Sequence, residues 1–235
     1  MDPEEGDGDR TGPLGIGNVY VVKDKGVVMI DGGAPKKGRA FLKGLDAIGI
    51  NPEEIQLIIL THAHWDHIGS AAEIKELTGA KVVLHKYEVH WLEESLKPMP
   101  PGVTVWGKIS TKLFSWTIVP SVHIKPTKVD IALGKELFPL MEYGISGRIV
   151  HTPGHSSGSV SVLLSSGEAF VGDMAMNKFP LRLWPGMPIY AENWPMLLNS
   201  WQELLKQGVN TVFPAHGDSF SADIIRKKLS KTKAS

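Results

Sequence analysis

A short segment crowded with histidines limits the folds open to this chain more than any other feature. An apolar run over residues 55–60 is followed directly by residues 61–67, which carry four side chains able to bind a metal ion. These are His62, His64, Asp66 and His67. On a helix, residues two apart do not face each other, and on a strand His67 would point away from the other two histidines. We therefore expect a shaped loop at the end of a buried strand, with its side chains turned into one cavity.

Three later positions share this setting, because each follows an apolar run and lies beside glycine or proline. They are His155, Asp173 and His216. Loops at strand ends are where active-site residues gather on a rigid scaffold. The chain has no cysteine, so a metal would need imidazole and carboxylate ligands, which suit Zn²⁺, Mn²⁺ and iron. We expect these side chains to converge at one edge of the fold.

The order of the apolar runs predicts an α/β chain built from two sheets. Runs typical of strands come first with helical segments between them, and a second set follows with the same arrangement. The expected strands are 18–22, 27–31, 55–60, 81–84, 128–133, 145–151, 159–164, 168–171 and 210–213. Apolar residues at helical spacing predict helices at 37–48 and 194–207. Two packed sheets with helices on the outside account for this order.

We found no linker and no internal repeat that would divide the chain. Residues 14–235 are therefore expected to form one domain that carries the candidate metal site, preceded by a flexible acidic tail at residues 1–13. Residues 97–127 contain five prolines, and we expect an irregular segment there. Its bulky aromatic residues can form a lid, a homodimer contact or part of the core; they are Trp106, Phe114 and Trp116.

The charge and hydropathy of the chain narrow its expected partners. Basic and acidic residues number 25 each, which argues against a nucleic-acid partner bound through a broad basic field. The N-terminus lacks the basic start and apolar stretch of a secretory signal, and no run of about 18 apolar residues predicts a membrane span. We expect a cytoplasmic protein that acts on a small-molecule substrate.

The combined motif resembles that of the metallo-β-lactamase-fold hydrolase superfamily. The pattern HxHxDH, then a later His, an Asp and a final His, is present in order from His62 to His216. The resemblance extends back to the hairpin at residues 18–31, whose last residue, Asp31, matches the acidic residue that ends an early strand of the family. It therefore covers nearly the whole chain.

This resemblance implies a four-layer αββα sandwich with a dinuclear metal site at one edge. By analogy, the first ion is bound by His62, His64 and His155. The second ion is bound by Asp66, His67 and His216. Asp173 is expected to bridge both ions, and Asp31 to support a ligand histidine or the motif loop from behind.

The expected reaction follows from metal chemistry. A bound ion lowers the pKa of water from about 15.7 to about 7, so a bridging hydroxide is available at neutral pH. That hydroxide, which Asp66 can orient, would attack a small ester, thioester or lactone. The expected cofactors are two divalent ions, zinc or else manganese or iron. Trp184, Tyr190 and Trp194 are candidates for lining the substrate pocket, with simple packing of a long loop as the alternative.

Several alternatives remain open within the superfamily. β-Lactamases of this fold generally lack the bridging aspartate, which argues against that activity. A phosphodiesterase of the same fold and a persulfide dioxygenase with one iron ion both resemble this pattern. A metal-free binding module would require that the ligand positions fail to converge. The remaining histidines are expected to be ordinary surface or core residues; they are His85, His90, His123 and His151.

Overall fold

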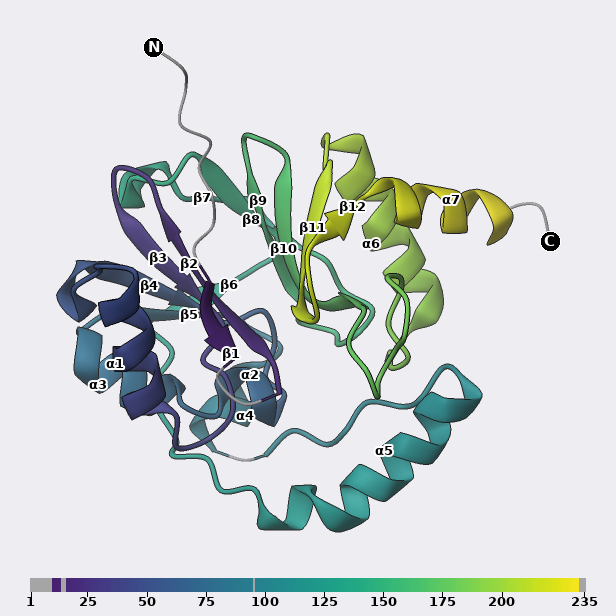
Figure 1. Cartoon of the computed structure of the whole chain (residues 1–235), viewed down its shortest axis with the longest axis horizontal. Coiled ribbons are helices and arrows are strands. Elements are labelled where there is room, and N and C mark those ends of the chain that lie inside the picture. The colour runs from purple at the N-terminus through teal and green to yellow at the C-terminus, as the bar shows by residue number, and fades with distance from the viewer. Residues whose placement is uncertain (1–9, 14–15, 95, 233–235) are drawn as a thin grey trace.

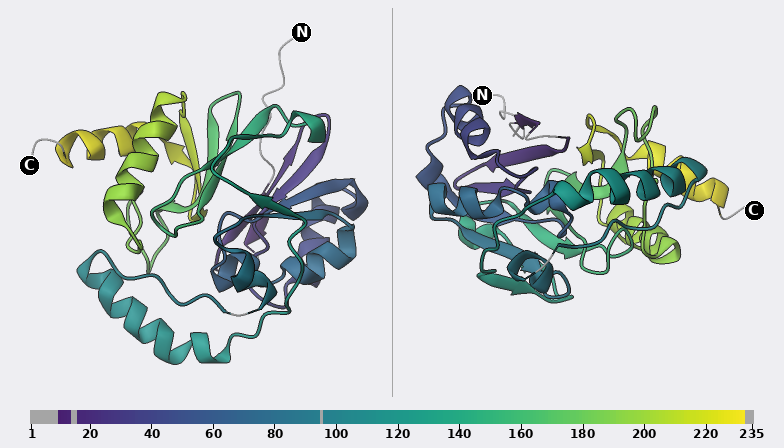
Figure 2. Two further views of the ribbon diagram at one scale, coloured as in Figure 1. Left: turned by 180° about the vertical axis from the view of Figure 1, so that it is seen from behind. Right: turned by 90° about the horizontal axis from the view of Figure 1, so that it is seen from below.

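Two six-stranded sheets pack face to face and helices cover their outer faces (Figure 1). This computed structural model describes residues 10–13, 16–94 and 96–232. Figure 2 shows the same layers from behind and from below. The four-layer αββα sandwich predicted from the sequence is confirmed.

The first sheet has the strand order β1-β2-β3-β4-β5-β6. Its strands are β1 (Arg10–Pro13), β2 (Asn18–Lys23), β3 (Val27–Ile30), β4 (Ile55–Ile59), β5 (Lys81–His85) and β6 (Ile131–Leu133). The first three strands are antiparallel, whereas β3 to β6 run parallel to one another. Parallel strands end at the same edge of a sheet, so the segments that follow β3 and β4 emerge side by side.

The second sheet has the strand order β12-β11-β10-β9-β8-β7. Its strands are β7 (Phe138–Pro139), β8 (Gly147–His151), β9 (Val160–Leu164), β10 (Glu168–Met176), β11 (Thr211–His216) and β12 (Phe220–Ser221). Its strands pair antiparallel except for β10 and β11, which run parallel. This one parallel pair carries the later half of β10 and the end of β11 to the same edge.

Helices complete the outer layers. The α-helices are α1 (Gly38–Ala47), α2 (Trp65–Ile68), α3 (Ala71–Thr78), α4 (Val89–Glu93), α5 (Val105–Thr117), α6 (Trp194–Lys206) and α7 (Asp223–Thr232). Short 3-10 helices lie at Pro52–Glu54, Val119–Ser121 and Met141–Tyr143. α1 and α3 pack on the first sheet, and α6 and α7 pack on the second. Among the described residues, no helix has the length and apolar character needed to cross a bilayer.

Three layers of apolar side chains hold the sandwich together. In β3, Val27 and Met29 point toward α1 and α3, whereas Val28 and Ile30 point into the core between the sheets. Both faces of this strand are therefore buried, which explains its uninterrupted apolar sequence. Phe170 of β10 reaches the same central core from the opposite sheet. The packing of this central core sets how the two sheets meet at the edge.

The N-terminal segment differs from its prediction. A flexible tail was expected over residues 1–13, but Arg10–Pro13 form β1 and pair antiparallel with β2. An edge strand pairs through main-chain N–H and C=O groups, which every residue but proline has. Such a strand can therefore form without an apolar pattern, and the sequence contains no sign of it. Residues 1–9 lie outside the described part of the chain.

The segment at residues 97–127 also differs, because it contains the helix α5 rather than being irregular throughout. The Thr104 side chain caps the first turn by accepting a hydrogen bond from the Gly107 N–H at 2.9 Å. The prolines of this segment flank the helix and do not interrupt it. The periodicity of α5 was missed because its large apolar residues do not face the protein core.

Substitution of Trp201 tests the packing of α6 on the second sheet. Its side chain is fully buried, and its indole N–H donates to the Met174 carbonyl at 2.9 Å. We expect Trp201→Ala to lower the free energy of unfolding by about 3–5 kcal/mol, because a large buried volume and a hydrogen bond are lost. Urea unfolding of the metal-free protein, followed by circular dichroism, measures this change.

The matched control is Trp184→Ala, because Trp184 is 76% exposed. Its effect on the free energy of unfolding should stay within about 0.5 kcal/mol. Similar losses for the two variants would contradict the packing of α6 described here.

Candidate metal centre

A buried carboxylate shapes the loop that follows β4. Asp31, directly after β3, accepts hydrogen bonds from the Thr61 main-chain N–H at 2.8 Å and the Thr61 hydroxyl at 2.9 Å. Its other oxygen lies 2.8 Å from Nδ1 of His67. Asp31 adopts a φ of 64°, a left-handed conformation that aspartate tolerates better than most residues. One side chain thus anchors both ends of the loop from Thr61 to His67.

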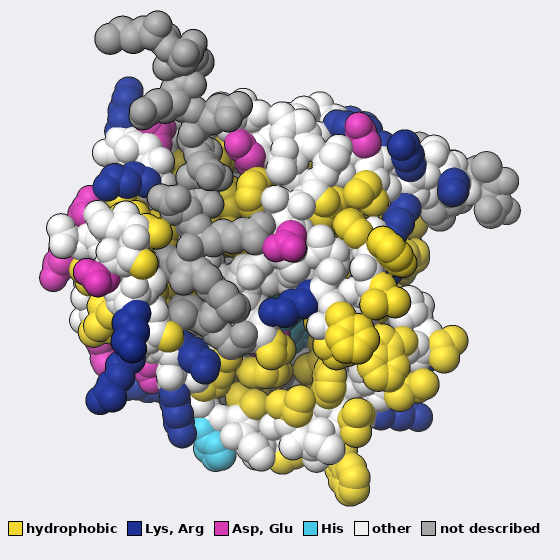
Figure 3. Space-filling view, in the orientation of Figure 1, with side chains coloured by type: hydrophobic (Ala, Val, Ile, Leu, Met, Phe, Trp, Pro, Cys, Tyr) yellow, Lys and Arg dark blue, Asp and Glu magenta, His cyan; other side chains and the backbone are white. Residues whose placement is uncertain are grey.

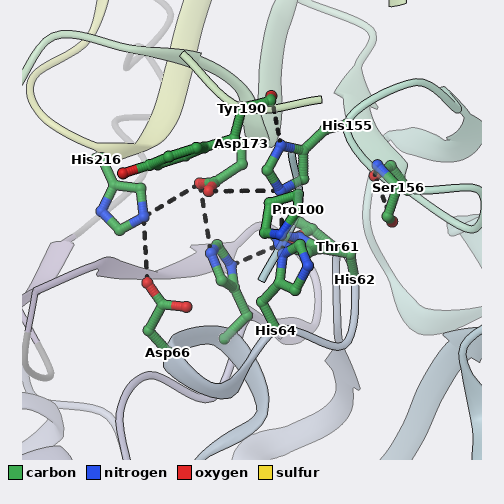
Figure 4. Close-up of polar contacts among 12 residues, drawn as sticks. Thr61, His62, His64, Asp66, Pro100, His155, Ser156, Asp173, Tyr190 and His216 are labelled. Carbon is green, nitrogen blue, oxygen red and sulfur yellow. Dashed lines mark hydrogen bonds and ion pairs between the residues drawn. The ribbon is translucent and has the colours of Figure 1, made fainter. Parts of the chain in front are cut away.

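The seven side chains named from the motif come together at the sheet edge (Figure 4). Potential ligand atoms within 4.8 Å of one another define three buried groups. These groups are His62, His64 and His155; His62, His67 and Asp173; and Asp66, His67 and His216. The first sheet supplies the residues of the motif loop, and the second supplies the other three. The ligand positions therefore converge, which argues against the metal-free binding module.

Asp173 on β10 lies between two of these groups. Its Oδ1 is 3.4 Å from Nε2 of His67 and 3.3 Å from Nε2 of His216. Its Oδ2 is 3.6 Å from Nε2 of His155. Gly172 places the strand here with a φ of 51°, and a Cβ at this position would lie 2.5 Å from the Thr61 hydroxyl. The close approach of β10 to the motif loop therefore requires glycine.

Several buried polar atoms of this cluster make no hydrogen bond. They are Nε2 of His62 and Nε2 of His64. Nε2 of His67 and Oδ1 of Asp173 also make no hydrogen bond, although they lie 3.4 Å apart as an ion pair. A buried polar atom without a partner costs about 1–3 kcal/mol. A divalent cation bound among these imidazole and carboxylate groups would remove that cost. The donor set contains only nitrogen and oxygen, so it fits zinc, manganese or iron.

Burial keeps part of the cluster neutral. It lowers the pKa of His62 and of His64 well below the usual value, and neighbouring histidines lower both further. The pKa of His155 is also lowered, again chiefly by burial. Neutral imidazole has the free lone pair that a metal ligand needs. These three histidines are therefore ready to bind a cation without first losing a proton.

The other part of the cluster is charged. Burial alone would lower the pKa of His216, but Asp173 and Asp66 raise it to about 10. Burial likewise opposes protonation of His67, but Asp31 and the other aspartates raise its pKa well above the usual value. Without a metal, two protonated histidines thus balance the buried carboxylates. A cation bound here would replace these protons, so binding would release them.

A buried ion pair that the sequence did not reveal supports the loops of the cluster. Glu88 is fully buried and accepts hydrogen bonds from the N–H of Ala63 at 3.2 Å and of Gly158 at 3.1 Å. Lys97 Nζ lies 2.6 Å from its Oε1 and is itself almost fully buried. Glu88 therefore ties the motif loop to the loop that carries His155. No periodic or motif signal separates this glutamate from its exposed neighbours in the sequence.

The remaining histidines lie outside the three groups of potential ligands in the described part of the chain. His85 and His151 stack on each other, with ring centroids 4.1 Å apart and an interplanar angle of 9°. His90 and His123 lie at the surface. The structure thus places all four apart from the cluster, as their sequence context predicts.

A cavity of about 200 Å³ opens above the cluster. The polar groups in its lining include His64, Asp66, Asp173 and His216. Its other walls are mainly apolar and come from α5, the residues on either side of it and the loop after β10, through Met99, Phe114, Ile118, Phe179 and Leu181. A cavity with one polar end and apolar walls suits a substrate that joins a polar reacting group to an apolar portion.

The three aromatic residues proposed for the substrate pocket have different positions. Tyr190 lines the cavity, and its hydroxyl lies 2.7 Å from the Ser110 hydroxyl on α5. Its main-chain carbonyl lies 3.1 Å from Nδ1 of His155. Trp184 is largely exposed, and Trp194, the first residue of α6, packs against the core of the second sheet; neither contributes to the cavity lining. Phe114 replaces them as an aromatic wall, from the helix that the sequence did not predict.

Comparison with known proteins places this arrangement in a family. The family model for the metallo-beta-lactamase superfamily matches residues 12–216. The probable metallo-hydrolase YqgX of Bacillus subtilis is 28% identical over 69% of this chain, and the match spans 67% of that protein. The metallo-beta-lactamase fold-containing protein ST1585 of Sulfurisphaera tokodaii is 29% identical over 91% of this chain and 77% of its own length.

A solved structure agrees with these relatives. The crystal structure of BLEG-1 B3 metallo-beta-lactamase superposes with a TM-score of 0.65 and 25% identity, covering 90% of this chain and 91% of that one. The family match includes every residue of the cluster from His62 to His216. The chain therefore belongs to the metallo-beta-lactamase superfamily.

Proposed function

We propose that this hydrolase of the metallo-beta-lactamase fold binds two divalent metal ions and cleaves a small ester, thioester or lactone. His62, His64 and His155 would hold one ion, and Asp66, His67 and His216 the other. The observation that carries the proposal is the position of Asp173, whose two carboxylate oxygens face the two sets of histidines. When bound, the ions would lower the pKa of a water molecule and polarise the substrate carbonyl.

The protein's own residues would orient the reactants. Asp66 lines the cavity, and its carboxylate can accept a hydrogen bond from the attacking water and so fix its direction. Asp31 holds His67 from behind through Nδ1, which fixes the orientation of that ring. The apolar walls would hold the non-reacting part of the substrate and exclude bulk water.

Lys178 favours a phosphodiester as the second candidate substrate. Its side chain lines the same cavity, and its ammonium group donates to the Ile16 carbonyl at 3.2 Å. A cation in this position would stabilise an anionic substrate. The mainly apolar walls support the ester or lactone more strongly, because a phosphodiester with two polar substituents would make no favourable apolar contact with these walls.

Metal content tests the dinuclear proposal directly. Protein purified without chelators should carry about two zinc, manganese or mixed ions per chain when measured by elemental mass spectrometry. Asp173→Ala should reduce that content, because the carboxylate between the two groups is removed. His123→Ala should leave it unchanged, because His123 is exposed and lies outside the groups of potential ligands.

Other metal contents would contradict the proposal. About one iron ion per chain would favour a persulfide dioxygenase, which oxygen uptake with a persulfide would then test. Protein that takes up no metal even after reconstitution would eliminate the catalytic proposal.

Substrate chemistry is tested with esters and lactones of increasing acyl length. Turnover should appear with these substrates, and kcat/KM should rise about threefold to fourfold per methylene while the chain still fits the cavity. Asp173→Ala should abolish turnover. Cleavage of phosphodiesters without cleavage of any ester or lactone would instead select the second candidate.

Glu88→Gln tests the support of the two loops. We expect the free energy of unfolding to fall by about 1–3 kcal/mol, because the buried Lys97 loses its closest carboxylate and keeps only its ion pair with the part-exposed Glu192. The kcat/KM should fall at least about tenfold, since the motif loop and the His155 loop lose their shared anchor. Urea unfolding and steady-state kinetics measure the two effects.

Two further variants distinguish the effect of the buried charges on stability from the effect of the Glu88 hydrogen bonds on activity. Glu88→Gln/Lys97→Met should recover stability, because the buried ammonium group is removed together with the buried carboxylate, but should not recover activity. Glu203→Gln removes an exposed ion pair with Lys206 and should change neither quantity. Full activity in Glu88→Gln would show that the anchor has no role in the site.

A further inference from the structure

The helix α5 presents most of its large apolar residues to solvent, and of these only Phe114 lines the cavity. Val105 is 79% exposed, Ile109 53% and Trp116 83%. At 100° per residue these three positions fall on one face of the helix. The contact with the protein is made by small residues, because Gly107 and Ser110 are the buried residues of α5. An ordinary surface helix has the opposite arrangement.

This inverted orientation is fixed by specific contacts. A Cβ on Gly107 would lie 2.2 Å from the Ile189 carbonyl oxygen. Only glycine at position 107 therefore allows α5 to lie this close to the segment that contains Ile189. The Ser110 hydroxyl also hydrogen-bonds to the Tyr190 hydroxyl. Rotating the helix to bury Val105 or Trp116 would break both contacts. The exposed apolar face is therefore built into the fold.

A second segment extends this apolar surface. In the loop after β10, Phe179 is 73% exposed, Leu183 70% and Trp184 76%. The indole N–H of Trp106 donates to the Pro180 carbonyl at 2.9 Å, which joins the loop to α5. Figure 3 shows hydrophobic side chains gathered around a hollow on this face. We call the exposed apolar residues of α5 and of residues 179–184 the docking face. Exposed apolar patches of this kind mark sites of interaction.

The charge around the docking face is positive, although the whole chain has no net charge. Neither residues 95–129 nor residues 174–191 contain an aspartate or glutamate. The basic residues closest to the docking face in these segments are Lys108 and Lys112 on α5 and Lys178 and Arg182 in the loop after β10. Lys97 does not contribute, because it is buried against Glu88, and Lys125 pairs with Glu76. Exposed indole rings beside lysines are typical of helices that lie in the headgroup region of a membrane.

We propose that the docking face binds the surface of an anionic lipid bilayer. A lipid surface can accept the apolar side chains and the lysine ammonium groups at the same time, since the lysine stems extend to the phosphates. A second copy of this chain is a poorer occupant. A two-fold contact through α5 would bring Lys108 and Lys112 of both copies together without an acidic partner from either segment.

The position of the cavity agrees with this partner. Phe114 and Ile118, at the end of α5, line the cavity together with Phe179. The acyl chain of a lipid-derived substrate that leaves the bilayer at the docking face would therefore enter a cavity with apolar walls. The binding itself does not depend on the proposed reaction, because none of the residues of the docking face is a potential metal ligand.

Sedimentation of the full-length protein with vesicles tests the proposal. Vesicles of equimolar phosphatidylcholine and phosphatidylglycerol should bind the protein, and added salt should weaken that binding. Vesicles of phosphatidylcholine alone should bind it more weakly. Tryptophan emission should shift to shorter wavelength on binding, because exposed indole rings enter the headgroup region.

Matched variants locate the surface. Ile109→Glu should lower the partition coefficient at least about tenfold, because it places a carboxylate in the middle of the docking face. Leu137→Glu is the control, since Leu137 is 58% exposed and directly precedes β7, at the opposite end of the molecule from α5. Lys112→Gln should reduce the partition coefficient about fivefold.

Three results would overturn the proposal. The first is no binding to the anionic vesicles. The second is equal binding by Ile109→Glu and Leu137→Glu. The third is a stable dimer in analytical ultracentrifugation that Ile109→Glu dissociates, which would show that a second copy covers this face. Circular dichroism of each variant verifies that it is folded, so loss of binding is not mistaken for loss of structure.

Discussion

The buried carboxylate of Asp31 is the contact on which the candidate metal centre depends. It accepts hydrogen bonds from Thr61 and lies within hydrogen-bond distance of His67, so it determines where the motif loop begins and where it turns into α2. The loop has no regular secondary structure of its own to hold four metal-binding side chains in place. A charged anchor at the end of the neighbouring strand supplies that rigidity, and a charge-assisted hydrogen bond is stronger than a neutral one.

The cluster also depends on the packing of the two sheets. His62 and His67 come from the first sheet, whereas His155, Asp173 and His216 come from the second. Their approach is set by the central core and by the close contact between Gly172 and Thr61. The same edge carries a second buried anchor, Glu88, which contacts loops from both sheets. Relative movement of the sheets would therefore separate the potential ligands, and this links the stability of the core to the geometry of the site.

The cavity walls are built differently from the cluster. They come from α5 and from residues 178–181, two segments that contact the sandwich through a few close approaches and leave their large apolar residues exposed. The rigid sheets thus hold the charged groups, and peripheral segments supply the apolar surface. This division lets the same segments shape the cavity and form the docking face.

The sequence by itself predicted two packed sheets with outer helices and named the residues that converge at the sheet edge, because each of these residues follows an apolar run typical of a buried strand. Its resemblance to a known family supplied the four-layer αββα arrangement. That these residues bind two metal ions stays a prediction, as does the expectation that residues 14–235 form one domain. Only the tertiary structure decided the role of Glu88, the start of β1 at Arg10 and the orientation of α5. In each case the reason is physical: a buried ion pair, a main-chain pairing and a helix packed through Gly107 and Ser110 depend on neighbours distant in sequence. Local patterns of hydropathy in the sequence do not predict those contacts.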